Sequence, residues 1–287
     1  VLMSASAGAG DAAIYRREGD AIVELGGLPS QWVGGFTMYA AADATAAFVG
    51  TNSAGGPGPG SGVWLNGVQM ATTATGTTAP GTADRFVQFD SVALAGRTTI
   101  DPGLIFGPTV VVRASTSGAS TANTGLWMGD QSLVLLALEG GTSPDLPAGV
   151  VFDDFGNVAF DPAATSTLAV FLAPLRGSGV TTANNRGIFA GRMLAGPGGA
   201  ARGMPMGAVF ATLDRPWVAG NEIVFTGRVT GGGVTANDDE AIWIASWPLG
   251  DVSMVIREGV AAPGIGGGVL LKERTSATAS FRQTVID

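Results

Sequence analysis

The stretch Gly177-Ser-Gly-Val-Thr-Thr-Ala-Asn-Asn-Arg-Gly-Ile-Phe-Ala-Gly191 decides the fold, because relatives of it recur along the chain. One relative runs Gly231-Gly-Gly-Val-Thr-Ala-Asn-Asp-Asp-Glu-Ala-Ile-Trp-Ile-Ala245, and another runs Ser120-Thr-Ala-Asn-Thr-Gly-Leu-Trp-Met-Gly129. Each is a connection rich in Gly, Thr and Asn that leads into an aliphatic and then an aromatic residue. With two weaker relatives nearer the start of the chain, the aliphatic anchors are Ile14, Val63, Leu126, Ile188 and Ile242. Anchors that recur roughly every 50 to 60 residues indicate an internal repeat.

A β-hairpin is predicted at each anchor, because the turn chemistry that follows the anchor recurs as well. Gly19-Asp20, Gly129-Asp130 and Gly250-Asp251 each separate two apolar runs, and Asn66-Gly67 does so in the second copy. Such dipeptides between apolar runs are hairpin signals. A glycine and then a proline follow each hairpin, and this pair ends a strand. Two more strands are expected before the next anchor, at 86–89 and 109–113, at 150–152 and 168–172, and at 208–210 and 223–225.

Four short strands in each repeat, with no helical period, predict an all-β fold. We expect residues 1–287 to form a single repeat-built domain, a β-propeller of about five four-stranded blades. One alternative is a propeller of six blades, with a degenerate blade within 85–125. A second alternative is another all-β fold built from repeats. Residues 1–3 and 280–284 both match the fourth strand of a repeat. The two ends are therefore expected to close the ring, either within one chain or between chains.

The composition excludes several classes of function. The net charge is −8, Lys272 is the only lysine, and no basic patch is visible, so nucleic acid and anionic membranes are poor partners. The longest apolar run, 133–138, is too short to span a bilayer. The chain has no cysteine and no histidine, which removes disulfides, thiolate metal sites and the commonest general base. Charged residues make up only 13% of the chain, about half the usual ~25%, and such a surface suits a homo-oligomer or polymer.

Three short elements carry a resemblance to a known family. They are Gly187-Ile-Phe-Ala-Gly191, Met254-Val-Ile-Arg-Glu-Gly-Val-Ala-Ala-Pro-Gly264 and Gly220-Asn-Glu-Ile-Val-Phe-Thr-Gly227. They resemble elements of the secreted bacterial tandem-repeat proteins that are named for an Asn-x-x-Gly repeat and often carry an anchor signal. The resemblance covers most of 120–270 and fades toward the N-terminus. It implies export and an extracellular or cell-surface setting, and it supplies no catalytic residue.

The acidic run that ends at Glu240 holds the best metal candidates, Asp238 and Asp239. Carboxylates close together in sequence suit Ca²⁺, which takes six to eight oxygen ligands. The spacing is not that of an EF-hand, and the equivalent loop at 183–186 carries no carboxylate. A turn whose acids face water is therefore the favoured interpretation, with Ca²⁺ as the alternative. No other cofactor is expected.

Catalysis by carboxylates is the less favoured interpretation of the remaining acids. Asp153-Asp154 is a second acidic pair, and paired carboxylates can hydrolyse glycosides. However, Glu139 and Glu258 recur at one repeat position, which indicates a structural role, and the expected inner strands are apolar at Phe152 and Phe210. Because the chain lacks histidine, a Ser-His-Asp triad is impossible. We therefore expect no enzyme activity.

The aromatic residues fall into a regular and an irregular set. Trp64, Trp127, Phe189 and Trp243 follow the anchors at one repeat position, so we favour a core role over a ring of sugar-stacking platforms. Trp217 and Trp247 break this pattern and are the candidates for a ligand-binding surface. The leading hypothesis is a non-enzymatic extracellular structural or adhesive protein that self-assembles by strand pairing between chains. The alternatives are a propeller that binds carbohydrate or a cell-surface ligand, and a carboxylate-based glycoside hydrolase or lyase.

Overall fold

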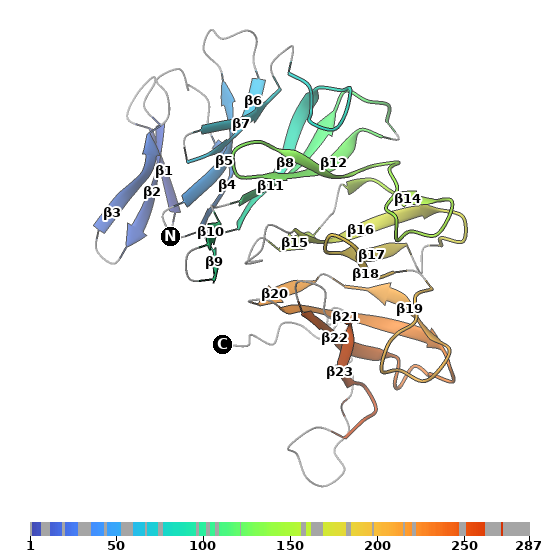
Figure 1. Ribbon diagram of the computed structural model, residues 1–287. Coiled ribbons are helices and arrows are strands. Elements are labelled where there is room, and N and C mark those ends of the chain that lie inside the picture. The colour runs from blue at the N-terminus through green and yellow to red at the C-terminus, as the bar shows by residue number, and fades with distance from the viewer. Residues whose placement is uncertain are drawn as a thin grey trace. The chain divides into compact units, whose positions relative to one another are not determined.

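A computed structural model of the chain shows an all-β protein made of several small antiparallel sheets (Figure 1). It describes residues 2–6, 12–18, 21–27, 36–42, 45–52, 60–66, 68–73, 77–95, 98–101, 104–106, 109–120, 122–155, 159–161, 169–181, 185–196, 198–214, 216–219, 222–246, 251–261 and 271. The chain divides into two compact units. The first comprises Val1–Gly141, Phe152–Asn157 and Pro162–Ala169, and the second comprises the rest.

Three sheets belong to the first unit. The first sheet contains β1 (Leu2–Ser6), β2 (Ala12–Glu18) and β3 (Ala21–Gly27), in that order. The second contains β4 (Phe36–Ala42), β5 (Thr45–Asn52), β6 (Gly60–Leu65) and β7 (Val68–Thr72), again in chain order. The third contains β8 (Phe86–Ala95), β11 (Thr109–Thr116), β12 (Thr124–Gly129) and β13 (Val134–Leu138), in the spatial order β8-β11-β12-β13. Each strand thus pairs with the next strand of its sheet, which is a meander.

Two more sheets repeat this meander. The fourth sheet contains β14 (Val150–Phe152), β16 (Val170–Gly177), β17 (Arg186–Phe189) and β18 (Met193–Ala195), and β15 (Ala159–Asp161) also pairs with β16. The fifth contains β19 (Ala208–Leu213), β21 (Glu222–Gly231), β22 (Glu240–Ser246) and β23 (Ser253–Arg257), and β20 (Trp217–Ala219) also pairs with β21. Four strands per repeat, predicted from the sequence, are confirmed in the second to fifth sheets.

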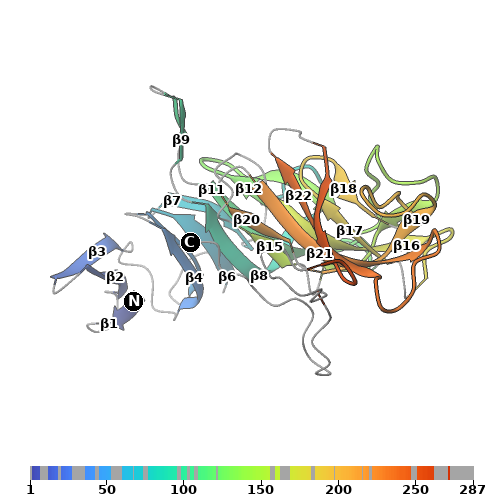
Figure 2. The ribbon, with the colours of Figure 1, turned by 90° about the horizontal axis from the view of Figure 1, so that it is seen from below.

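The segment 85–125 holds an inserted hairpin rather than a further blade-like sheet. Between β8 and β11 the structure describes β9 (Thr98–Asp101) and β10 (Leu104–Phe106), which pair only with each other. Figure 2 shows this hairpin projecting away from the sheet that contains β8 and β11. The long interval between the second and third anchors therefore contains an insertion within one repeat, and the alternative of six blades, with a degenerate blade in this segment, stays a prediction.

The five anchors occupy one structural position, on the last strand but one of each sheet's meander, which is the third strand in the second to fifth sheets and β2 in the first. Where that strand pairs with the last strand, the register shifts between the anchor and the aromatic residue after it, and this happens in all five sheets. The shifts lie at Ile14/Tyr15, Val63/Trp64, Leu126/Trp127, Ile188/Phe189 and Ile242/Trp243. A bulge adds a residue to one strand and increases the local twist. The sequence repeat is thus a repeat of one bulged hairpin.

The connection from the fourth strand to the next repeat also recurs. The amide of Gly140 donates to the carbonyl oxygen of Phe152 at 2.9 Å, and the amide of Phe152 donates to that of Gly141 at 2.9 Å. In the same way, the amide of Gly259 donates to the carbonyl oxygen of Leu271, and the amide of Leu271 donates to that of Val260. Gly140 and Gly259 have φ values of 73° and 77°, which glycine adopts without steric strain. The glycine after the hairpin is therefore required by the connection in these two repeats.

The core of the first unit lies between its second and third sheets. Strand β8 lies against β4, β5 and β6. The buried side chains come from both sheets and include Val49, Val63 and Leu65 on one side and Phe86, Val112 and Trp127 on the other. In the second unit β17 lies against β19. Within the described residues, no helix is long and apolar enough to cross a membrane.

Candidate functional site

The recurrent aromatic residue on the third strand belongs to the core. Trp127 and Trp243 are fully buried. The indole Nε1–H of Trp127 donates to the carbonyl oxygen of Pro80 at 3.0 Å, and that of Trp243 donates to Arg202 at 3.0 Å. Each indole also meets a phenylalanine edge to face, Phe86 at 4.9 Å and Phe210 at 5.0 Å between ring centroids. Two matching sets of contacts confirm the core interpretation and leave no exposed ring for stacking on a sugar.

The acidic loop before β22 is closed by hydrogen bonds and an ion pair. One carboxylate oxygen of Asp238 accepts from the amide of Thr235 at 2.6 Å and from its hydroxyl at 2.8 Å. The other oxygen pairs with the guanidinium of Arg257 on β23. The Thr235 amide and hydroxyl, together with the charge of Arg257, hold the pKa of Asp238 below its ordinary value, against an opposing effect of desolvation. The loop is thereby fastened to the last strand of its own sheet.

The neighbouring residue is engaged in the same way, so the loop is built as an ion-pair network. Asp239 lies 3.4 Å from Nη1 of Arg228 on β21. Nη2 of that arginine lies 3.8 Å from Oε2 of buried Glu240. Among the described residues, no three or more His, Cys, Asp or Glu side chains are grouped so that they could hold a metal ion. Ca²⁺ binding by Asp238 and Asp239 stays a prediction. The sequence favours a turn whose acids face water, whereas in the structure both carboxylates are paired with arginines.

Buried glutamates mark the end of the third-strand hairpin in two repeats. The amide of Glu139 donates to the carbonyl oxygen of Thr124 at 2.9 Å, and the amide of Glu258 donates to that of Glu240 at 2.8 Å. Oε2 of Glu139 also accepts from the Thr124 hydroxyl at 3.1 Å. The recurrence of Glu139 and Glu258, noticed in the sequence, therefore corresponds to one structural position, as expected of a residue that supports the fold.

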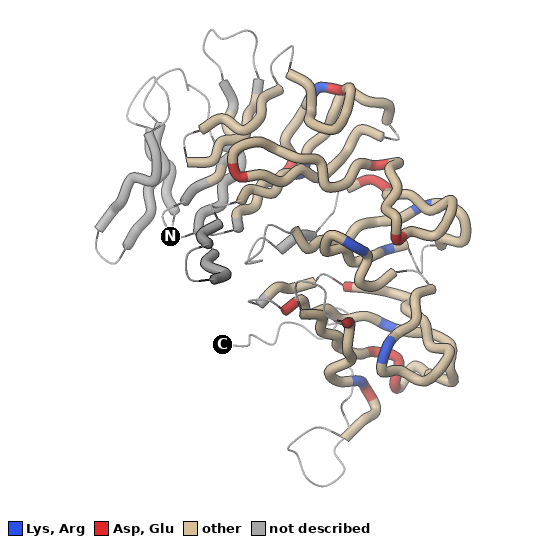
Figure 3. Tube along the Cα trace, viewed as in Figure 1, with Lys and Arg blue, Asp and Glu red and all other residues tan. Residues whose placement is uncertain are grey.

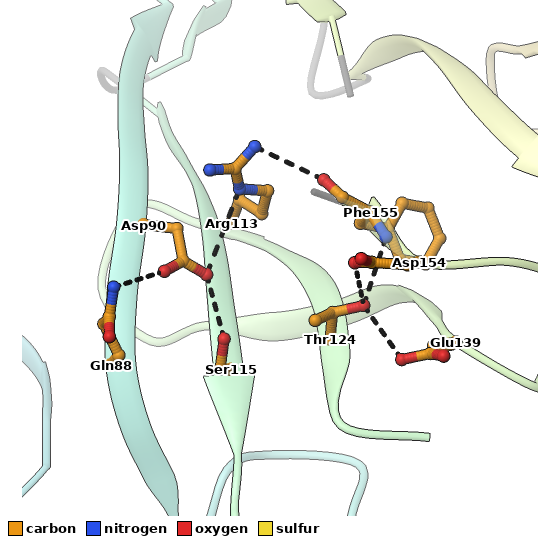
Figure 4. Close-up of polar contacts among 8 residues, drawn as sticks. All are labelled: Gln88, Asp90, Arg113, Ser115, Thr124, Glu139, Asp154 and Phe155. Atoms are coloured by element: carbon orange, nitrogen blue, oxygen red, sulfur yellow. Dashed lines mark hydrogen bonds and ion pairs between the residues drawn. The ribbon is translucent and has the colours of Figure 1, made fainter. Parts of the chain in front are cut away.

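A polar cluster in the first unit fastens the segment after β14 to β11 and β12 (Figure 4). Nη1 of Arg113 donates to the carbonyl oxygen of Phe155 at 3.3 Å, and the amide of Phe155 donates to the Thr124 hydroxyl oxygen at 3.1 Å. Both backbone groups of this buried residue are thus satisfied by side chains. The Thr124 hydroxyl lies 3.2 Å from Asp154, one of the acidic pair at 153–154. This cluster joins chain segments that are distant in sequence.

The other half of the cluster lies on β8 and β11. The Asp90 carboxylate accepts from Gln88 at 2.8 Å and from Ser115 at 3.0 Å, and it lies 4.0 Å from Nε of Arg113 (Figure 4). The role of these residues was not predicted from the sequence. A signal was present, because Phe86 and Asp90 are matched in the fifth sheet by Phe210 and Asp214, and Asp214 accepts from Thr226 at 2.9 Å.

The fourth strand of each meander lies at the edge of its sheet. Strands β7, β13 and β18 read Val-Gln-Met-Ala-Thr, Val-Leu-Leu-Ala-Leu and Met-Leu-Ala, with no charge and no proline. Val68 on β7 is 61% exposed and Val134 on β13 is 62% exposed. Charged residues in the described parts of the chain stand singly or in small groups elsewhere (Figure 3). Natural edge strands are usually protected by charge, proline or a bulge. These three edge strands each carry the extra residue of a bulge but lack charge and proline, so their exposed apolar side chains can still contact another strand.

The model of one protein family matches residues 6–193 and again residues 190–275. The chain belongs to this family, DUF7453, a family of unknown function. The two matches together include all five anchors, so the family covers every repeat described above. Neither a curated protein nor a solved structure matches the chain. The resemblance to the Asn-x-x-Gly repeat proteins stays a prediction.

The two irregular tryptophans were the candidates for a ligand-binding surface. Trp217 is half-buried on the short strand β20, where it pairs with Val224 of β21. Trp247 lies outside the described residues. Ligand binding at these two positions stays a prediction.

Proposed function

We propose that this chain is a non-enzymatic extracellular structural or adhesive protein whose repeats form a five-bladed β-propeller. The propeller is supported by the meander order of the strands, by one bulged hairpin in all five sheets, and by the packing of β8 against the preceding sheet. Strands in chain order and sheets stacked on their neighbours are the features of propeller blades. The extracellular setting is supported by the resemblance of the repeat elements to secreted proteins.

We infer further that copies of the chain join through the edge strands of their sheets. The observation that carries this inference is β13, Val134–Leu138, an edge strand made of one valine, three leucines and one alanine. Pairing with a strand of a second copy would supply hydrogen bonds to its backbone and cover its apolar side chains. The low charge of the whole chain removes most of the repulsion that would oppose such contacts.

A structural role also agrees with how the acidic residues are used. Asp238, Asp239, Glu139 and Asp90 are each engaged by amides, hydroxyls or guanidinium groups within their own unit. A general acid or base needs access to a substrate and a pKa near the working pH, whereas the pKa of Asp238 is lowered. The glycoside hydrolase alternative therefore has less support than the structural proposal.

The test is the size of the particles across a dilution series, by light scattering and negative-stain electron microscopy. The wild-type chain should form assemblies, and the double variant Val68→Lys/Val134→Lys should need at least a tenfold higher concentration to assemble, because lysine protects edge strands. Met206→Lys is the matched control, since that side chain is 98% exposed in a turn outside the strands. A wild-type chain that is monomeric at every concentration would refute the proposal, and so would a double variant that assembles like wild type.

A further inference from the structure

A pocket of about 200 Å³ lies in the second unit, beside β18, the start of β19 and the segment before β23. Its charged lining consists of Arg192, Arg202 and Asp251. Its apolar lining includes Met193, Phe210 and Val252. A cavity of about 150 Å³ can hold benzene, so this space suits a ligand of the size of one aromatic ring or one sugar ring.

The two arginines of the pocket interrupt the repeat. Arg202 and Pro80 hold the same position, because each accepts the indole N–H of the tryptophan in its own repeat. Trp127 pairs with Leu135, and Trp243 pairs with Met254. Counted back three residues from these partners, Ser132 in the third sheet is the strand-register counterpart of Asp251 in the fifth. In the same way, the pairing of Trp64 with Gln69 and of Phe189 with Met193 makes Val68 the counterpart of Arg192. The backbone contacts recur and the two arginines do not, so the fold of the repeat does not account for Arg192 and Arg202. Asp251, in contrast, belongs to the Gly-Asp turn that recurs in the sequence.

The ion pair within the pocket is open to exchange. Nη1 of Arg202 lies 2.9 Å from Oδ1 of Asp251, and the two side chains are 59% and 75% exposed. Exposed ion pairs contribute little to stability, because water competes for both partners. A carboxylate from a ligand can therefore replace that of Asp251 at the guanidinium. Arg192, which lines the same pocket, supplies a second positive charge.

We propose that this pocket binds a small organic anion through a carboxylate. The planar guanidinium group of Arg202 matches the two oxygens of a carboxylate, and Arg192 adds to the attraction. The carbon skeleton of the ligand lies against Met193, Phe210 and Val252. Such a carboxylate can come from a free carboxylic acid or from an acidic sugar. The proposal is independent of the assembly proposed above, because it uses the side chains of one copy.

The test measures the dissociation constants of benzoate, glucuronate and neutral benzamide by NMR titration of the full chain. At least one of the two acids should bind. If benzoate binds more tightly than glucuronate, neutral benzamide should bind at least tenfold more weakly than benzoate. Arg192→Gln and Arg202→Gln should each weaken binding of the acid about tenfold, since a hydrogen bond to a charged group is lost. Arg186→Gln is the control for the lost charge, because Arg186 is exposed on β17 and does not line the pocket.

Asp251→Asn provides a result of the opposite sign, which damage to the fold would not produce. The variant removes the carboxylate that competes for Arg202, so the acid should bind about two- to fivefold more tightly. If glucuronate binds more tightly than benzoate, the site is assigned to acidic sugars. If benzoate binds more tightly than glucuronate, the site is assigned to apolar acids. The proposal is refuted if neither acid binds or if Asp251→Asn weakens the binding of the acid. It is also refuted if the chain binds benzoate but binds neutral benzamide equally tightly.

Discussion

Replacing Trp127 by phenylalanine tests the shared contacts of the repeat most directly. The change removes the N–H that donates to Pro80 at 3.0 Å, in a side chain with no exposed surface. Pro80 is exposed and water can replace the lost donor, so the loss of this part-buried hydrogen bond costs about 0.5–1.5 kcal/mol. The smaller ring also leaves a cavity beside Phe86, which adds about 1 kcal/mol. The free energy of unfolding should therefore fall by about 1.5–2.5 kcal/mol.

The same substitution at Trp243 should have the same effect, because its contacts match. Its indole donates to Arg202 at 3.0 Å and meets Phe210 at 5.0 Å. Phenylalanine fits this position of the repeat, since the fourth sheet has Phe189 there, so both variants should fold. Urea unfolding is the assay, and with an m value of about 2–3 kcal/mol/M each midpoint should fall by about 1 M.

Two results would contradict this reasoning. A change below about 0.5 kcal/mol in both variants would mean that the indole N–H groups do not make buried hydrogen bonds. Losses that differ between the variants by more than about 2 kcal/mol would mean that the two repeats do not share one set of contacts. Met206→Leu serves as the surface control, because it changes an almost fully exposed side chain.

Two further predictions concern a glycine in the inter-repeat connection and the acidic loop. In urea unfolding, Gly203→Ala should lower the free energy of unfolding by more than Gly179→Ala does. Both glycines have positive φ, but only at Gly203 would the added methyl group lie 2.6 Å from the side chain of Met254. Equal losses of stability in the two variants would contradict this packing. The pKa of Asp238 is lower in the folded state than in the unfolded state. The contribution of this carboxylate to the stability of the folded chain should therefore be complete above the unfolded-state pKa of about 3.9, and it should be lost as the pH falls through the folded-state pKa. Wild type should therefore lose more stability than Asp238→Asn in acid, as measured by urea unfolding from pH 6 to pH 2, and parallel losses would show that the loop does not hold this carboxylate.

The strands and their order in each repeat could be predicted from the sequence, because they depend on neighbouring residues. Apolar runs, hairpin dipeptides and strand-ending glycines act over a few residues, and they located β12 with β13 and β22 with β23 correctly. The inserted hairpin β9–β10 was missed, since two short strands without an anchor look like part of a blade. Counting intervals between anchors cannot distinguish an insertion from an additional repeat.

The repeat, the position of each hairpin and the structural character of Glu139 and Glu258 follow from the amino-acid sequence. The bulges and the contacts between polar side chains became visible only in the folded protein. Arg113 reaches the carbonyl oxygen of Phe155, which is 42 residues away, and Arg202 and Asp251 meet in one pocket beside Arg192. Such contacts depend on how one sheet packs against the next, and this packing is set by buried aromatic and aliphatic side chains from several repeats. Local sequence signals carry no information about that packing.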